Sequence, residues 1–168
     1  MLKELKIKKI HLVGFSLGSL IARHFAAEHN DKLSSLVLYG SIYKRSEEQK
    51  RVVQNRFELI KTNKPIAKDR AVRRWFSDKF LRENKEIYNK MFSILEENDH
   101  VNLLKAYKIF VNYEDDDKLL SNINTNTLVT TGQYDVGSTV EMAKKLTEQI
   151  KGAKYIDCLL YTSPSPRD

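Results

Sequence analysis

The apolar pattern between residues 9 and 40 restricts the fold more than any other part of this 168-residue chain. A short apolar run rich in β-branched residues, "KKIHLVG", comes first, and "KLSSLVLYG" is a second apolar run. Between them, from Leu17 to about His29, apolar residues recur at the spacing of a helix. Strand, helix and strand at this distance form a βαβ unit, which is typical of a parallel sheet. The sequence therefore predicts an α/β fold.

The middle of the chain has a different character. From about Lys44 to Lys118 we find four segments in which apolar residues recur at helical spacing, and no convincing strand. The βα pattern then resumes with the apolar run "NTLVTTG", a helix for which Ser138 is a candidate N-cap, and the start of another strand, "AKYIDC". We expect an α/β core that is interrupted by a helical insertion. The predicted order is core, insertion and core, in residues 1–43, 44–118 and 119–157.

Charge and composition exclude several classes of protein. The net charge is +7, from 29 Lys and Arg against 22 Asp and Glu, but acidic residues are mixed into most basic stretches and no nucleic-acid-binding motif is present. No apolar stretch reaches the roughly 20 residues of a membrane helix, and one cysteine cannot form an internal disulfide. We therefore expect a cytoplasmic protein that binds neither nucleic acid nor membrane, and its oligomeric state is open.

The acidic run "EDDD", residues 114–117, raises the question of a metal site. Four adjacent acids do not place their carboxylates on one face, and no histidine accompanies them. We expect instead a solvated loop that returns from the helical insertion to the core. The sequence predicts no metal and no organic cofactor.

Ser16 stands at the junction of the first strand and the following helix. Gly14-Phe15-Ser16-Leu17-Gly18 fits G-x-S-x-G, a pattern that is weak alone but gains weight between a buried strand and an apolar helix. In such a nucleophile elbow the serine has a strained positive φ, and its neighbours two residues away must be small. The Leu17 N–H would point to the same place from a helix N-terminus, where it could stabilise an oxyanion. The alternative is a plain Gly-Ser-Gly turn.

With this motif the chain resembles the α/β-hydrolase fold enzymes, and the similarity extends as far as Asp157. Residues 10–41, "IHLVGFSLGSLIARHFAAEHNDKLSSLVLYGS", are similar to the family's elbow, helix and next strand. The insertion looks like the family's cap, or lid, and residues 74–110 are loosely similar to the cap of the 3-oxoadipate enol-lactonase-like subgroup. The resemblance implies a serine hydrolase that acts on an ester, lactone or related carbonyl substrate through an acyl-enzyme. Ser16 would be the nucleophile, and Leu17 would contribute to the oxyanion hole.

The same resemblance implies a catalytic acid in the loop after "TLVTTG". The family places this acid in a G-x-x-D context, which Gly132-Gln133-Tyr134-Asp135 fits, so Asp135 is the candidate. It would accept a hydrogen bond from the catalytic histidine, fix its tautomer and stabilise the imidazolium. The alternative is an ordinary loop aspartate near a helix N-terminus.

The catalytic histidine that the resemblance requires is absent from this chain. It should follow the acid and the next strand, and none of the four histidines is placed there: His11, His24, His29 and His100. The tail "CLLYTSPSPRD", residues 158–168, can be encoded by a transposase adapter used in sequencing-library preparation, which makes Asp157 suspect too. The loop that supplies the family's second oxyanion N–H is missing ahead of Met1. We expect a fragment cut at both ends, inactive and poorly stable as it stands.

Three other interpretations stay open at this point. A peptidase, acyltransferase or carbon–carbon bond hydrolase can have the same fold, since fold does not fix function. A non-catalytic binding protein on this fold is the second alternative, although such proteins tend to lose members of the triad. The third is that these 168 residues have no function by themselves. The expected partner is a small-molecule ester or lactone substrate.

Overall fold

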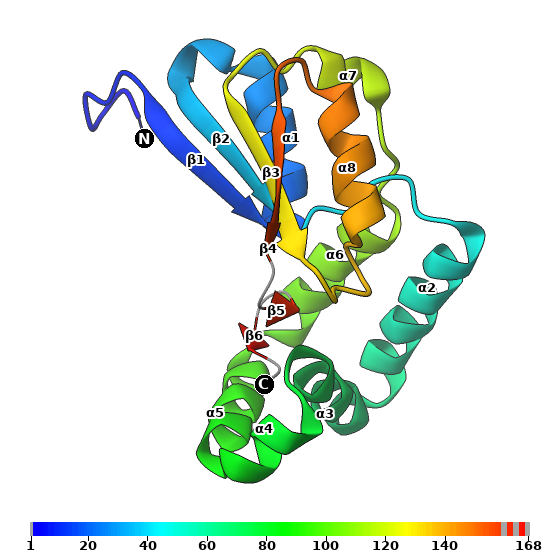
Figure 1. The fold of residues 1–168 in the computed structure, drawn as a ribbon. Coiled ribbons are helices and arrows are strands. Elements are labelled where there is room, and N and C mark those ends of the chain that lie inside the picture. The colour runs from blue at the N-terminus through cyan, green and yellow to red at the C-terminus, as the bar shows by residue number, and fades with distance from the viewer. Residues whose placement is uncertain (1, 159–160, 163–164, 167–168) are drawn as a thin grey trace. The chain divides into compact units, whose positions relative to one another are not determined.

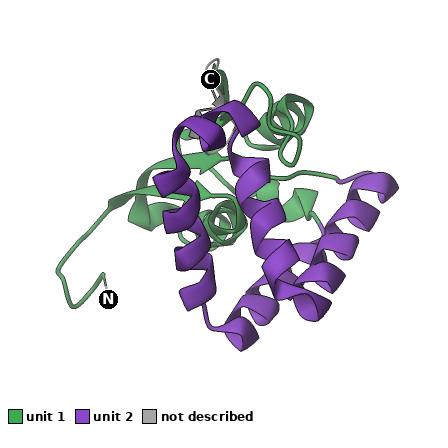
Figure 2. Ribbon diagram, turned by 90° about the horizontal axis from the view of Figure 1, so that it is seen from below, with its two compact units in different colours: residues 1–44, 115–163 green, residues 45–114, 164–168 purple. Residues whose placement is uncertain are grey.

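The computed structural model describes residues 2–158, 161–162 and 165–166 and divides the chain into two compact units. Unit 1 comprises residues 1–44 and 115–163, and unit 2 comprises residues 45–114 and 164–168 (Figure 2). Part of the tail that the sequence assigns to an adapter lies outside the described residues. Its described part begins with the last residue of a strand, Cys158, and includes two short strands, β5 Tyr161–Thr162 and β6 Ser165–Pro166. The origin of this tail stays a prediction.

Unit 1 contains a four-stranded parallel sheet in the order β1-β2-β3-β4 (Figure 1). Gly14 pairs with Leu38, Leu38 with Val129, and Val129 with Tyr155, so one row of paired residues crosses all four strands, although the pairing of β1 with β2 shifts between Ile10 and His11. The parallel sheet predicted from the βαβ pattern is therefore confirmed. The strands are β1 Ile10–Phe15, β2 Leu33–Tyr39, β3 Thr127–Gly132 and β4 Lys154–Cys158.

Two helices cover one face of this sheet (Figure 1). Helix α1, Leu17–Glu28, packs on β1 and β2, and helix α8, Val140–Gln149, packs on β3 and β4. Side chains alternate between the two faces of a strand. In the central strands β2 and β3 this alternation places Leu36, Leu38 and Val129 in the buried core. Two short helical elements complete the unit, η1 Asn30–Lys32 and α7 Asp117–Ser121. The buried apolar residues of both layers include Leu20, Ala22, Ala26, Leu36, Leu38, Val129, Met142, Ala143 and Leu146.

The acidic run is not the merely solvated loop that the sequence predicted. Asp115 accepts hydrogen bonds from the Lys44 backbone N–H at 2.6 Å and from the buried Arg23 guanidinium at 3.2 Å. Asp117 accepts from the Tyr43 hydroxyl at 2.7 Å and from the Lys44 ammonium at 2.6 Å. These acids therefore connect the two segments of unit 1 on either side of unit 2: the segment that starts at Asp115 and the segment that ends at Lys44. Their partners lie 71 to 92 positions away in sequence, so local pattern could not reveal them.

The described residues of unit 2 form five helices, one more than the apolar spacing predicted. Polar side chains define where they start: Ser46 forms a capping box with Gln49, while Asn63 caps α3 and Asp99 caps α6. The unpredicted helix α4 has six residues, too few to show an apolar period, and Ser77 caps it. None of the described helices is long and apolar enough to cross a membrane. The helices are α2 Glu47–Thr62, α3 Lys64–Trp75, α4 Asp78–Glu83, α5 Lys85–Glu97 and α6 His100–Val111.

Candidate active site

Ser16 occupies a tight turn between β1 and α1. Its φ of 51° and ψ of −119° lie in a region that non-glycine residues adopt only under strain. Neighbouring groups hold this conformation. The Ser16 N–H donates to Tyr39 O at 3.0 Å, and Ser19 donates to Ser16 O from both its N–H, at 2.9 Å, and its hydroxyl, at 2.5 Å. The positive φ expected of a nucleophile elbow is therefore present at Ser16.

The two glycines of the motif have different surroundings. A Cβ atom on Gly14 would lie 2.7 Å from each of three atoms: Ala22 Cβ, Gly18 O and Ser19 Cα. Such an approach is sterically forbidden, so β1 and α1 can lie this close only with glycine at position 14. A Cβ on Gly18 would meet no atom within 4 Å among the described residues outside the backbone of its own helix. The expectation that Gly18 must be small is therefore wrong for the packing observed here.

The Leu17 backbone N–H lies at the first position of α1. The first N–H groups of a helix have no acceptor within the helix, and the helix dipole adds positive potential at this end. Because Leu17 directly follows Ser16, an oxygen atom bonded to a carbon under attack by the serine would lie near this N–H. The position suits one donor of an oxyanion hole.

Asp135 lies in the loop between β3 and α8. Its Oδ1 accepts hydrogen bonds from the N–H groups of Gly137, at 2.8 Å, and Ser138, at 2.9 Å. Its own N–H donates to Gly132 O at 3.0 Å. The loop is therefore a defined turn with the carboxylate half-buried. The N-cap of α8 is Thr139, whose hydroxyl accepts from the Met142 N–H at 3.2 Å, so the prediction of Ser138 as N-cap is wrong.

The serine turn and the acid loop are both fastened to the end of β2. Ser16 donates to the carbonyl of Tyr39, and the buried Ser138 hydroxyl donates to the next carbonyl, Gly40 O, at 2.8 Å. Because the strands are parallel, their carboxyl ends lie at one edge of the sheet. The structure thus brings Ser16 and Asp135 to the same edge of unit 1. Sequence reasoning missed the Ser138 anchor because its acceptor is 98 positions away.

No histidine of unit 1 takes part in this edge among the described residues. His11 lies near the start of β1, where its Nδ1 is 2.7 Å from the Ser35 hydroxyl. His24 lies within α1 and His29 at its C-terminal end. His100 begins α6 in unit 2. The structure therefore gives no reason to assign any of the four as a base.

The pairing of Asp117 shifts pKa values in the acidic run. The hydrogen bond from the Lys44 ammonium, followed by that from Tyr43, lowers the pKa of Asp117 below its ordinary value of 3.8. Burial, followed by the hydrogen bond to Asp117, raises the pKa of Tyr43. These acids are thus occupied in ion pairing and hydrogen bonding. The described residues contain no group of three or more His, Cys, Asp or Glu side chains that could hold a metal ion.

Several known proteins that are similar to this chain are hydrolases. A (E)-2-((N-methylformamido)methylene)succinate hydrolase from Acinetobacter baylyi is 27% identical over 152 residues, which cover 88% of this chain and 55% of that protein. The solved structure of the enol-lactonase from Burkholderia xenovorans matches with a TM-score of 0.76 at 22% identity, and the match covers 93% of this chain and 59% of the enol-lactonase chain. An esterase from Exiguobacterium antarcticum has a TM-score of 0.79 at 21% identity, covering 93% and 60%. The chain thus spans little more than half of these relatives.

The sequence of this chain also matches the model of a protein family. The α/β hydrolase fold family matches residues 1–93, which include β1, the Ser16 turn, α1 and β2. That match covers more than half of the 168 residues. It agrees with the parallel sheet of unit 1 and with the solved structures that share this fold. The chain belongs to the α/β-hydrolase fold family.

Proposed function

We propose that this chain is the part of a serine hydrolase that carries the nucleophile, Ser16, and the catalytic acid, Asp135. The observation that carries the proposal is the strained backbone of Ser16, with its φ of 51°. Strain of this kind persists where the surrounding structure enforces it, and it is common at functional sites. A serine needs this turn to present its hydroxyl at the top of the sheet.

The proposed reaction proceeds through an acyl-enzyme. The Ser16 Oγ attacks the substrate carbonyl carbon while a histidine, supplied by residues beyond this chain, takes the hydroxyl proton. The oxyanion of the tetrahedral intermediate accepts a hydrogen bond from the Leu17 N–H. Collapse breaks the bond to the leaving alcohol, which receives the proton from the histidine. Water, deprotonated by the same histidine, then attacks the acyl carbon. The bond from this carbon to Ser16 Oγ breaks, the acid product leaves, and the histidine returns the proton to Ser16 Oγ. Asp135 holds the histidine throughout.

The relatives support the proposed substrate class. Their names describe a substituted methylenesuccinate hydrolase, an enol-lactonase and an esterase. Hydrolytic attack at a carbonyl carbon is the common element, so we assign this chain an ester, lactone or related carbonyl substrate. In the same proposal, the helices of unit 2 form the cap of the enzyme. The cytoplasmic location expected from the sequence stays a prediction.

The experiment compares two polypeptides, the 168-residue chain and the product of the uninterrupted gene, on p-nitrophenyl butyrate. We expect hydrolysis by the gene product only, because the 168 residues lack the base. In the gene product, Ser16→Ala should lower kcat by about 10,000-fold or more. Ser34→Ala removes a comparable hydroxyl from an exposed position on β2 and should leave kcat unchanged.

Two results would contradict the proposal. If Ser16→Ala leaves the hydrolysis by the gene product intact, Ser16 is not the nucleophile. If the 168-residue chain hydrolyses the ester and Ser16→Ala abolishes this activity, the base lies within the chain and the missing-histidine account is wrong.

A further inference from the structure

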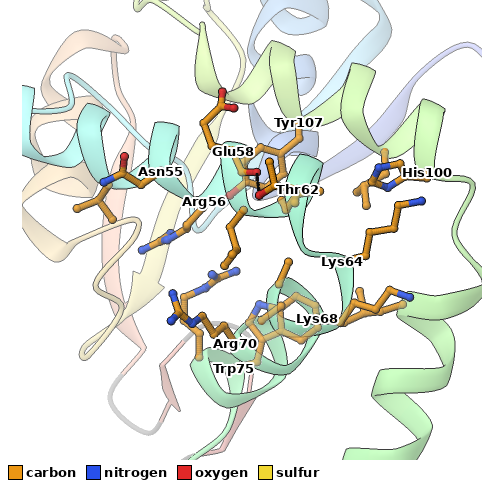
Figure 3. Close-up of a pocket in the computed structure, with 18 residues that line it drawn as sticks. Asn55, Arg56, Glu58, Thr62, Lys64, Lys68, Arg70, Trp75, His100 and Tyr107 are labelled. Carbon is orange, nitrogen blue, oxygen red and sulfur yellow. Dashed lines mark hydrogen bonds between the residues drawn. The ribbon is translucent and has the colours of Figure 1, made fainter.

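Unit 2 contains a pocket of about 750 Å³ that the proposed catalytic residues do not line. Pockets for small molecules commonly measure about 300–1,000 Å³. Helices α2 and α3 supply most of the lining, and α5 and α6 complete it. Figure 3 shows Trp75 of α3 and Tyr107 of α6 on opposite sides of this space. With Leu59 and Leu103, they give the pocket an apolar surface.

The charged groups of this pocket are almost all cationic. Among the described residues that line the pocket, the one carboxylate is that of Glu58, and it already has two partners. Its Oε2 lies 2.8 Å from the Lys61 ammonium, and its Oε1 accepts from the Gln54 amide at 3.0 Å. The lining residues therefore include more cationic than anionic side chains, which favours an anion in the pocket. The cationic side chains are Arg56, Lys64, Lys68, Arg70 and Arg74.

The cationic groups lie in two places. Figure 3 shows Arg56 of α2 and Arg70 of α3 on one side of the pocket, and Lys64 and Lys68 on the other. Lys68 is partly occupied, with its ammonium 3.8 Å from Glu96 and 5.9 Å from the centre of the Phe92 ring. Guanidinium groups bind carboxylates through two parallel hydrogen bonds, which ammonium groups cannot do. The arginine side is thus the better place for a carboxylate.

We propose that this pocket binds small organic carboxylates with an apolar body. The carboxylate would lie against Arg56 and Arg70, and the apolar body against Trp75. Arg56 is half-buried and Arg70 is exposed, and both border a concave, apolar space in which an anion is attracted more strongly than on a convex surface. The proposal does not depend on the role of Ser16, because all lining residues belong to unit 2.

Trp75 makes the proposal easy to test, because it is the only tryptophan of the chain. Its fluorescence would be followed while the 168-residue chain is titrated with three ligands that share one apolar body: hydrocinnamate, its neutral amide, and phenylpropylamine. We expect saturable binding of hydrocinnamate, about tenfold weaker binding of the amide, and no binding of the amine. Added salt should weaken the binding of hydrocinnamate but not of the amide.

Arginine variants test the position of the carboxylate. Arg56→Gln and Arg70→Gln should each raise the Kd of hydrocinnamate about fivefold, the value of one partly exposed charge pair, and leave the Kd of the amide unchanged. Arg51→Gln removes the same charge from an exposed position of α2 outside the pocket and should have no effect. Unchanged binding of the amide also shows that each variant is folded.

Three results would overturn the proposal. The first is equal affinity for hydrocinnamate and its amide, which would mean an apolar cavity without anion selectivity. The second is an equal loss of affinity in Arg51→Gln and in the pocket variants, which would mean a general charge effect. The third is the absence of any saturable fluorescence change. The ligand series decides the matter even if one variant fails to fold.

Discussion

Replacing Gly14 by alanine would place a methyl group where β1 and α1 meet. The added Cβ would lie 2.7 Å from Ala22 Cβ, Gly18 O and Ser19 Cα, and two of these three atoms belong to the backbone. A flexible side chain could move aside, but here the strand and the helix must separate. Overpacking of this kind costs about 1–3 kcal/mol, and we expect the upper end because backbone must move.

Gly18→Ala provides the matched control within the same motif. No described atom lies within 4 Å of the new Cβ outside the helix backbone, and Gly18 lies in the first turns of α1. Alanine favours a helix over glycine by up to about 1 kcal/mol, so this variant should be slightly more stable than the parent chain. The same substitution, glycine to alanine, should thus lower the stability of the chain at position 14 and raise it at position 18.

Thermal unfolding of both variants, followed by far-ultraviolet circular dichroism, measures the difference. A loss of about 3 kcal/mol should lower the Tm of a chain of this size by about 6–12 °C in Gly14→Ala, while Gly18→Ala should not lower it. Equal Tm values for Gly14→Ala and the parent chain would refute the close approach of β1 and α1. A similar loss in both variants would show that Gly18 is also packed against another part of the protein.

Two further predictions concern the anchors of unit 1. Ser138→Ala removes the hydrogen bond to Gly40 O and leaves a buried carbonyl without this donor. In urea unfolding it should lower the free energy of unfolding by about 1–3 kcal/mol, whereas the control Ser34→Ala should lower it by less than about 0.5 kcal/mol. A loss no larger than that of Ser34→Ala would mean that the anchor contributes nothing. Asp117→Asn tests the ion pair with Lys44. The pKa of Asp117 is lower in the folded chain than its ordinary value of 3.8. Its contribution to stability is therefore fully present above pH 3.8 and is lost as the pH falls through the pKa of the folded chain. The Tm of the parent chain should therefore fall more steeply than that of Asp117→Asn between about pH 5 and pH 2, and parallel curves would contradict the role of this pair.

Local features of the sequence predicted the sheet and the serine turn well. Apolar runs bounded by glycine indicated β1 and β2, and the G-x-S-x-G pattern indicated a strained residue at Ser16. These predictions succeed because strand patterns and tight turns depend on neighbouring residues. The apolar spacing did not predict the short helix α4, because six residues are too few to show a helical period.

Long-range contacts were beyond the reach of the sequence patterns. The anchor from Ser138 to Gly40 and the contacts of Asp115 with Arg23 join residues more than 90 positions apart. Periodicity contains no information about such partners, so the sequence predicts a solvated loop for the acids and no anchor at Ser138. The N-cap of α8 is misplaced by one residue, since Thr139 and not Ser138 caps this helix. The requirement for a small residue at Gly18 failed because it came from the motif rather than from the packing of this chain.

The central claim is that Ser16 and Asp135 act with a histidine that lies beyond this chain. Reading the uninterrupted gene across both ends of the 168-residue sequence tests it most directly. The account predicts that the strand β4 continues in natural sequence past Ile156, that a histidine follows it, and that a glycine-containing loop precedes Met1. A gene without a histidine after this strand would leave Ser16 without a base, and genomic sequence identical to residues 158–168 would contradict the account of the tail.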